Sequence, residues 1–156
     1  KKSKFVAVNT QLNSSNLGFH VISKYIGANF ITINETEMRH ELRNKTEHRV
    51  PLIKTLSKKL KSKYTHVTSG EMGSVIYNRT LKEIISCPAF ANKVIDKVGT
   101  GDTMLAILAI SLFKKFDIKF SMFLSALVAA QNIQHMANKN PISKINITRA
   151  LQSYLK

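Results

Sequence analysis

The sequence predicts an α/β fold of three layers, with a mainly parallel sheet, helices on both faces and an antiparallel edge near residues 74–86. Two observations lead to this prediction. Short apolar runs that suit buried strands alternate along the chain with longer segments of helical character. A turn containing two glycines also separates the predicted strands 64–68 and 74–77, which is typical of an antiparallel pair.

Composition narrows the class of protein. Residues 1–156 are predicted by size to be a single domain, and their formal net charge of +15 favours anionic partners such as nucleotides, sugar phosphates, nucleic acid or an anionic membrane surface. The single cysteine, Cys87, excludes an internal disulfide, so the expected location is cytoplasmic. The apolar run 104–113 is too short to span a bilayer and no targeting segment is visible, so no membrane partner is predicted.

The first third of the chain is predicted to form a strand, a loop, a helix and a second strand. Residues 5–9 form a short apolar run that predicts a buried strand, and a polar loop follows over residues 9–16. Residues 18–27 fit a helix with one apolar face, and residues 30–33 predict the next strand. In a doubly wound sheet, loops after the carboxyl ends of strands meet ligands. The polar residues of this loop equally suit ordinary turns.

Asn34 and Glu37 follow the second predicted strand with the spacing of a capping box. In that arrangement each side chain accepts a hydrogen bond from the backbone N–H of the other residue at the start of a helix. The pair therefore predicts a helix that begins just after residue 34.

Residues 49–63 predict a basic helix. Ile53, Leu56 and Leu60 form its apolar stripe, which leaves most lysines on the solvated side, namely Lys58, Lys59, Lys61 and Lys63. A nucleic-acid surface would mix aromatic side chains and arginines into such a patch. The segment has one arginine and no aromatic residue before Tyr64, so a solvated outer helix is the favoured interpretation.

Residues 64–77 predict two strands around the turn Thr68-x-Gly70-x-x-Gly73. Because glycine has no side chain, such a turn lets the backbone approach a ligand closely, although many turns of this form only punctuate a hairpin. Residues 84–90 predict another short strand that ends in a turn through Cys87 and Pro88.

The run Asp96-Lys97-Val98-Gly99-Thr100-Gly101-Asp102 comes directly before an apolar helix predicted over residues 103–115. Two glycines around one small residue allow a tight turn that leaves backbone N–H groups at the helix start to bind an anion. Asp102 lies within reach of a hydroxyl that attacks a phosphoryl group there, and it could act as general base. Glycine and aspartate are also ordinary capping residues.

Two further helices complete the chain. The apolar helix 103–115 must be covered on several sides, and the next, about 120–136, has the same character. Pro141 ends this structure, and residues 145–155 predict a last amphipathic helix. The five histidines are far apart and show no ligand spacing, so no metal site built from protein ligands is predicted.

The motif Asp-x-x-Gly-x-Gly-Asp resembles the second signature of the ribokinase-like (PfkB-type) carbohydrate kinases. Two other motifs follow the order of that family, Asn34/Glu37 and Thr68/Gly70/Gly73. The region from Val8 to Glu37 is similar to the heptose-phosphate kinases of bifunctional ADP-heptose synthases. Thr100 stands where alanine is more usual, and Lys97 where a hydroxyl residue is common.

The resemblance implies a phosphotransferase that moves a phosphoryl group from ATP to a hydroxyl of a sugar or sugar phosphate, with a heptose phosphate as one candidate. It implies that Gly99, Thr100, Gly101 and Asp102 form the anion hole, with Asp102 as base. It further implies that Thr68, Gly70 and Gly73 face the phosphates and ribose of the nucleotide, and that Asn132 faces the base. Asn34 and Glu37 would hold Mg²⁺ through water.

Family members are about twice as long, and the sugar-binding and lid parts of their N-terminal half have no counterpart here. The chain therefore resembles the C-terminal, nucleotide-binding part of a sugar kinase. The expected partners are the N-terminal half of the same polypeptide, a second copy in a homodimer and a fused nucleotidyltransferase domain. Two other functions stay open: a nucleotide-binding module without catalysis and, less favoured, a nucleic-acid-binding domain.

Overall fold

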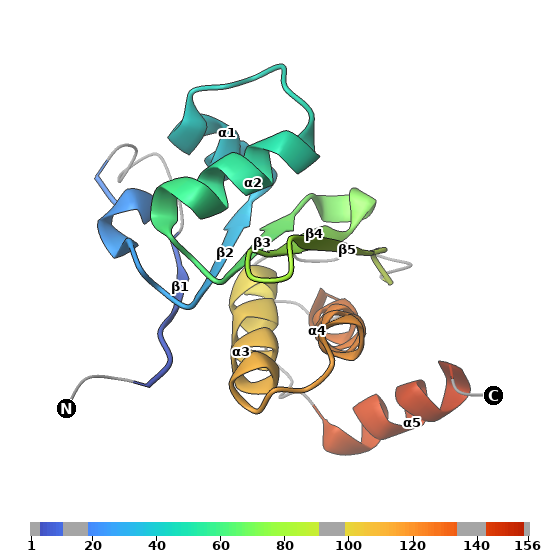
Figure 1. The fold of residues 1–156 in the computed structure, drawn as a ribbon. Helices are drawn as coiled ribbons and strands as arrows, with labels where there is room; N and C mark the ends of the chain where they lie inside the picture. Colours follow the sequence, from blue (N-terminus) through green and yellow to red (C-terminus); the bar gives the residue numbers. More distant parts are fainter. Residues whose placement is uncertain (1–3, 11–18, 91–98, 134–142, 155–156) are drawn as a thin grey trace. The chain divides into compact units, whose positions relative to one another are not determined.

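The computed structural model describes residues 4–10, 19–90, 99–133 and 143–154, and gives only the backbone of residues 132 and 133. The chain divides into two compact units, residues 1–86 and 87–156. Figure 1 shows the elements of both.

The first unit is built on a five-stranded sheet with the order β1-β2-β3-β4-β5. The strands are β1 (Ala7–Asn9), β2 (Phe30–Asn34), β3 (Tyr64–Thr68), β4 (Ser74–Asn78) and β5 (Glu83–Cys87). The first three strands run parallel to one another, and β4 runs antiparallel to β3. The predictions of a mainly parallel sheet and of an antiparallel edge are therefore confirmed. β1 begins two residues later than expected, and β5 ends at the predicted turn through Cys87 and Pro88.

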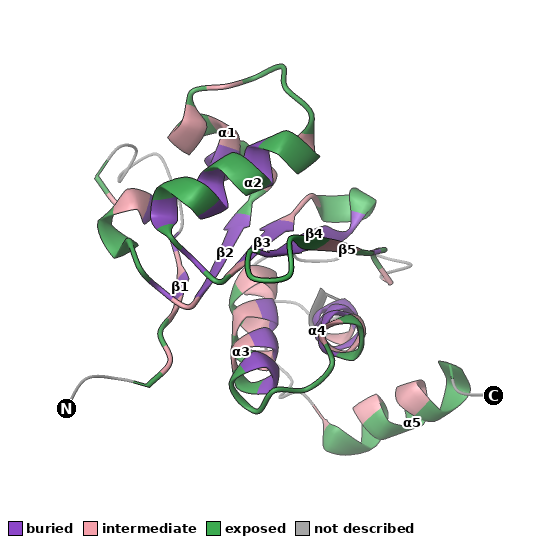
Figure 2. Cartoon of the chain, viewed as in Figure 1, coloured by how far each residue is buried: buried purple, intermediate pink, exposed green. Residues whose placement is uncertain are grey.

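Two helices cover one face of this sheet, α1 (Glu35–Leu42) and α2 (Arg49–Leu60). Alternate strand residues such as Ile31, Ile33 and Val67 point to that face because side chains alternate along a strand. Leu56 and Leu60, both completely buried, supply part of the facing helix surface. Figure 2 shows buried and exposed patches alternating along α2. Burying each such side chain contributes roughly 1.5–3 kcal/mol. The predicted stripe on α2 is confirmed, and its lysines are exposed as expected.

The helix predicted over residues 18–27 is wrong for the described residues. Only a single 3₁₀ turn forms there, η1 (Ile22–Tyr25). Ile22 is buried, but Phe19 and Ile26 are 77% and 60% exposed, so most of the apolar pattern has no core to face. Gly27, at φ 89°, then redirects the chain and donates its N–H to the carbonyl of Leu60.

The second unit contains three helices among its described residues, α3 (Thr100–Phe113), α4 (Ile118–Ile133) and α5 (Lys144–Tyr154). All three were predicted, with ends that differ by up to three residues where they can be compared. Phe90, Phe123 of α4 and Tyr154 of α5 form an aromatic cluster, with ring centroids 5.4–5.6 Å apart. None of the described helices is long and apolar enough to cross a bilayer.

Helix α3 differs from its prediction in how it is buried. It buries Met104, Leu108 and Leu112, whereas Ile110 and Phe113 are 61% and 50% exposed. An apolar helix buries only the faces that other elements reach, and the buried residues of α3 recur every three or four positions, on one face. Among the described residues, the prediction that α3 is covered on several sides is therefore not met.

Candidate functional site

The carboxyl ends of β2 and β3 bring three predicted site positions together. The parallel register pairs Asn34 with Thr68, each the last residue of its strand. Glu37 follows three residues after Asn34, and the turn containing Gly70 and Gly73 follows Thr68 at the same edge. This is the edge at which open α/β sheets bind ligands.

The capping box at the start of α1 is confirmed. Asn34 Oδ1 accepts from the backbone N–H of Glu37 at 2.8 Å, and Glu37 Oε2 accepts from the backbone N–H of Asn34 at 3.0 Å. Asn34 is exposed, whereas Glu37 is only 6% exposed. Both side chains are thereby fixed at the edge of the sheet, with oxygen atoms oriented by the helix start itself.

The turn between β3 and β4 depends on its two glycines. Gly70 has φ 56°. Gly73 has φ 75° with ψ −142°, a combination that residues with a side chain almost never adopt. The turn is closed by hydrogen bonds from Ser69 N–H to the Gly73 carbonyl, 2.8 Å, and from Gly73 N–H to the Gly70 carbonyl, 3.1 Å. A Cβ built on Gly70 would meet no atom within 4 Å, so glycine is favoured there by the left-handed φ angle and not by lack of space.

A cluster that sequence reasoning missed adjoins this turn. The Ser69 hydroxyl donates to Glu35 Oε2 at 2.7 Å and accepts from Arg49 Nη1 at 2.8 Å. Arg39 forms an ion pair with the other oxygen of Glu35, also at 2.7 Å. The Ser69 hydroxyl, together with the guanidinium groups of Arg39 and Arg49, holds the pKa of the Glu35 carboxyl below its ordinary value against the opposing effect of burial.

The signal for this cluster lies in the register rather than in any local motif. Glu35 and Ser69 directly follow Asn34 and Thr68, so the pairing of those two residues brings the next two side chains together. The register of parallel strands is set by the packed sheet, which explains why the sequence alone did not reveal the contact.

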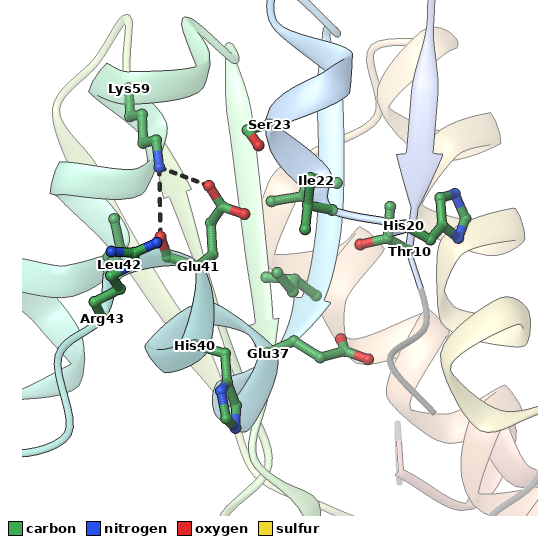
Figure 3. A pocket seen from close by; sticks show the side chains of 12 residues that line it. Thr10, His20, Ile22, Ser23, Glu37, His40, Glu41, Leu42, Arg43 and Lys59 are labelled. Atoms are coloured by element: carbon green, nitrogen blue, oxygen red, sulfur yellow. Dashed lines mark hydrogen bonds and ion pairs between the residues drawn. The ribbon is translucent and has the colours of Figure 1, made fainter. Parts of the chain in front are cut away.

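A hollow of about 670 Å³ lies beside the carboxyl ends of β1 and β2. Thr10, His20, Ile33, Glu37 and Lys59 are among its lining residues. Figure 3 shows Glu37 directed from α1 toward the side of the hollow where Thr10 and His20 lie. Glu37 thus belongs both to the capping box and to the wall of an open space in the first unit.

In the second unit, the glycine motif forms the start of α3. Gly99 is the N-cap at φ 79°, and its carbonyl accepts the first helical hydrogen bond from Thr103 N–H at 2.9 Å. Thr100, Gly101 and Asp102 are the first three helical residues, and the Asp102 side chain is exposed. The prediction that glycine permits a tight turn into a helix here is met, although α3 starts three residues before the predicted position.

The remaining predicted positions are described only in part. Asn132 lies in the last turn of α4, but its side chain is outside the described residues, as are Asp96, Lys97 and Pro141. Within the described ranges, no group of three His, Cys, Asp or Glu side chains could hold a metal ion. Asn34 and Glu37 supply one amide and one carboxylate, a donor set that suits Mg²⁺ with most of its own water retained.

Comparison with known proteins decides the family. The model of the pfkB family carbohydrate kinases matches residues 1–145. The chain belongs to the pfkB family. The predicted resemblance is therefore confirmed, and within this pfkB-family chain the three motifs occur in the order described above.

Curated relatives carry the name bifunctional protein HldE. That of Helicobacter pylori (strain ATCC 700392 / 26695) is 37% identical over 101 residues, which are 62% of this chain and 21% of the relative. That of Campylobacter curvus is 36% identical over 112 residues, 69% of this chain and 23% of the relative. The chain thus spans about a fifth of the length of the curated relatives it matches.

Solved structures show the fold. The ribokinase of Arabidopsis thaliana, complexed with ribose and ATP, matches with a TM-score of 0.67 at 22% identity, over 80% of this chain and 41% of that protein. Phosphofructokinase-2 of Escherichia coli matches with a TM-score of 0.70 at 13% identity, over 85% of this chain and 43% of that protein. The predicted ribokinase-like fold class is therefore confirmed.

Proposed function

We propose that the chain is the nucleotide-binding part of an ATP-dependent sugar kinase and supplies its general base, Asp102. The observation that carries this proposal is the start of α3, where Gly99 adopts φ 79° and Asp102 follows as the third helical residue. Backbone N–H groups at a helix start favour a bound anion, and an aspartate beside them is suitably located to accept a hydroxyl proton.

The proposed reaction transfers the γ-phosphoryl group of ATP. Asp102 accepts the proton of a sugar hydroxyl, whose oxygen forms a bond to the γ-phosphorus while the bond from that phosphorus to the bridging oxygen of ADP breaks. The backbone N–H groups of residues 99–102 would stabilise the charge that develops on the transferred group. Thr68, Gly70 and Gly73 would face the nucleotide phosphates and ribose, and Asn132 the base.

Magnesium fits the residues at the edge of the sheet. Asn34 and Glu37 would hold the ion through its bound water, since the capping box already orients their oxygen atoms. When bound, Mg²⁺ would neutralise charge on the nucleotide phosphates.

The acceptor in this proposal is a sugar or sugar phosphate, and the HldE relatives favour a heptose phosphate. The sugar-binding and lid parts, and a fused nucleotidyltransferase domain, would be other segments of the same polypeptide. The short coverage of the HldE relatives agrees with this expectation.

Calorimetric titration of the chain with MgATP and MgADP tests the proposal, beside a Gly101→Val variant and a short DNA duplex. We expect nucleotide binding that the variant loses, and weak DNA binding that falls steeply with salt. Robust DNA binding without nucleotide binding would contradict the proposal and favour a nucleic-acid-binding domain, the alternative that the net charge of +15 supports.

Turnover separates a kinase from a module that only binds nucleotide. In the full-length protein, Asp102→Asn should lower kcat by roughly 10²–10⁴-fold, the usual contribution of general base catalysis, and should leave MgADP affinity nearly unchanged. Unchanged turnover in Asp102→Asn would show that another group is the base.

A further inference from the structure

Four charged or polar side chains from separate parts of the first unit form one connected relay at the carboxyl edge of the sheet. Arg39 pairs with Glu35, Glu35 accepts from Ser69, and Ser69 accepts from Arg49. Glu35 is the first residue of α1 and Arg49 the first of α2, while Ser69 directly follows β3. The relay therefore ties the starts of both helices to the turn before β4.

Ser69 is the central member of the relay because its hydroxyl is both donor and acceptor. It donates to a carboxylate, which cannot donate, and accepts from a guanidinium, which cannot accept, so the bridging group must do both, as a hydroxyl does. The backbone N–H of Ser69 also donates to the Gly73 carbonyl. The turn is thus fixed both by its own backbone hydrogen bonds and by the side-chain contacts of the relay.

Arg39, at one end of the relay, is itself held by several hydrogen bonds. Arg39 donates through Nε and Nη2 to Glu35 Oε1, at 3.1 and 2.7 Å, and through Nη1 to the carbonyls of Lys45 and Glu47, at 3.1 and 3.0 Å. Glu35 is therefore fixed through both of its oxygens. Charge-assisted hydrogen bonds of this kind are stronger than neutral ones, so the relay can resist displacement of the turn.

Arg49 occupies a helix position at which a positive charge is unfavourable for helix stability. It is the first residue of α2, whose first turn contains no acidic residue, and a cation is unfavourable near the positive end of a helix dipole. Departures from a local rule are expected at functional positions. The contact with Ser69 keeps this positive charge, half-buried, beside the turn of the proposed nucleotide site.

We propose that Ser69 is a positioning residue for the phosphoryl donor: through Glu35 and Arg49 it holds the turn 69–73 in the conformation that receives the nucleotide phosphates. This inference rests on the proposed function, since it names a further residue of the same site. The relay acts on the phosphate-facing turn, so its effect should depend on the phosphates of the ligand and not on the base.

The test measures the affinity of the intact protein for MgADP and for adenosine, in wild type, Ser69→Ala and Ser69→Thr. Ser69→Ala removes both contacts and should weaken MgADP binding at least tenfold while changing adenosine binding less than twofold. Ser69→Thr keeps the hydroxyl and should restore MgADP affinity to within threefold of wild type. Ser153→Ala is the matched control, because it also removes a serine hydroxyl, one that donates to the Ala150 carbonyl within α5 at 2.8 Å and is not part of the relay.

Each other outcome overturns the inference in a recognisable way. The inference fails if MgADP affinity is unchanged in Ser69→Ala, or if affinity for MgADP and for adenosine falls equally. It also fails if Ser69→Thr binds MgADP as weakly as Ser69→Ala, or if Ser153→Ala shows the same loss. If Gly101→Val abolishes MgADP binding while Ser69→Ala does not alter it, the proposed function stands and only this inference fails. If wild type does not bind MgADP, both fail.

Discussion

His66 shows how burial at a single residue couples stability to pH. It is completely buried in β3, its Nδ1 lies 2.8 Å from Thr32 Oγ1, and its Nε2 is a buried atom for which the described residues provide no hydrogen-bond partner. Burial lowers the pKa of His66 to about 3. The folded chain therefore keeps this ring neutral, whereas the unfolded chain protonates it near its ordinary value of 6.5.

Acidification should weaken the fold through His66. Because the pKa is lower in the folded state, the unfolded state binds the additional proton, so stability is full above about pH 6.5 and falls as pH drops below it. Between pH 7.5 and 5.5 we expect a loss of roughly 1–1.5 kcal/mol in the free energy of unfolding, measured by urea denaturation. His66→Gln should lack this component, and an identical pH dependence in the variant would contradict the assignment.

Gly99 and Gly101 lie two residues apart and differ in backbone conformation. Gly99 has φ 79°, whereas Gly101 is a helical residue whose φ is not positive. Gly99→Ala should therefore lower the free energy of unfolding by about 1 kcal/mol, and Gly101→Ala should raise it by roughly 0.5 kcal/mol through higher helix propensity. Thermal denaturation of both variants checks this difference.

The same pair separates stability from ligand binding. Under the proposed function, the methyl group of Gly101→Ala occupies space near the phosphate, so MgADP affinity should fall at least tenfold in a protein that is as stable as wild type or more so. A Gly101→Ala variant with wild-type affinity would mean that phosphate does not approach this turn.

At the scale of elements, the start of α1 combines a structural and a proposed functional role. Glutamine can replace glutamate in a capping box, because its side-chain oxygen still accepts from the backbone N–H. Glu37→Gln should therefore keep the free energy of unfolding within about 0.5 kcal/mol of wild type, whereas Asn34→Ala should lower it by about 1 kcal/mol. Chemical denaturation of the two variants makes the comparison.

Magnesium dependence is the second measurement on these variants. If Glu37 holds water around Mg²⁺, Glu37→Gln should need at least several-fold more Mg²⁺ for half-maximal ADP binding, since the carboxylate charge is gone. Equal Mg²⁺ requirements in Glu37→Gln and wild type would leave Glu37 with its capping role alone.

Element predictions succeeded where local chemistry determines the structure. The capping box predicted the start of α1, and the stripe of Ile53, Leu56 and Leu60 predicted the buried face of α2. The helix predicted over 18–27 failed because its apolar spacing was real but only Ile22 found a core, and residues 22–25 formed a single 3₁₀ turn. Periodicity reports which residues could share a face and not whether the fold supplies a partner for it.

At the scale of the whole molecule, the main feature is the excess of positive charge. The chain contains 24 Lys and Arg residues and only nine Asp and Glu residues. Repulsion among the excess positive charges opposes the compact state. Salt screens this repulsion over a distance of about 10 Å at 0.1 M.

Moderate salt should therefore stabilise the folded chain. Between 20 and 200 mM NaCl we expect Tm to rise by roughly 2–4 °C, corresponding to about 1 kcal/mol. Differential scanning calorimetry measures the shift, and sucrose at matched osmolality serves as an uncharged control. A Tm that is constant or falls over this range would show that the excess charge is already compensated in the folded chain.

The sequence by itself determined the family motifs, the alternation of strands and helices, the capping box and the glycines at the turns. These features depend on backbone preferences and on hydrogen bonds within a few residues, so neighbouring residues are enough to specify them. Only the tertiary structure decided the relay of Arg39, Glu35, Ser69 and Arg49, the burial of His66 and the exposure of apolar side chains beside η1 and on α3. Those outcomes depend on strand register and on which surfaces meet, because contacts between residues far apart in sequence exist only once the sheet and its helices have packed.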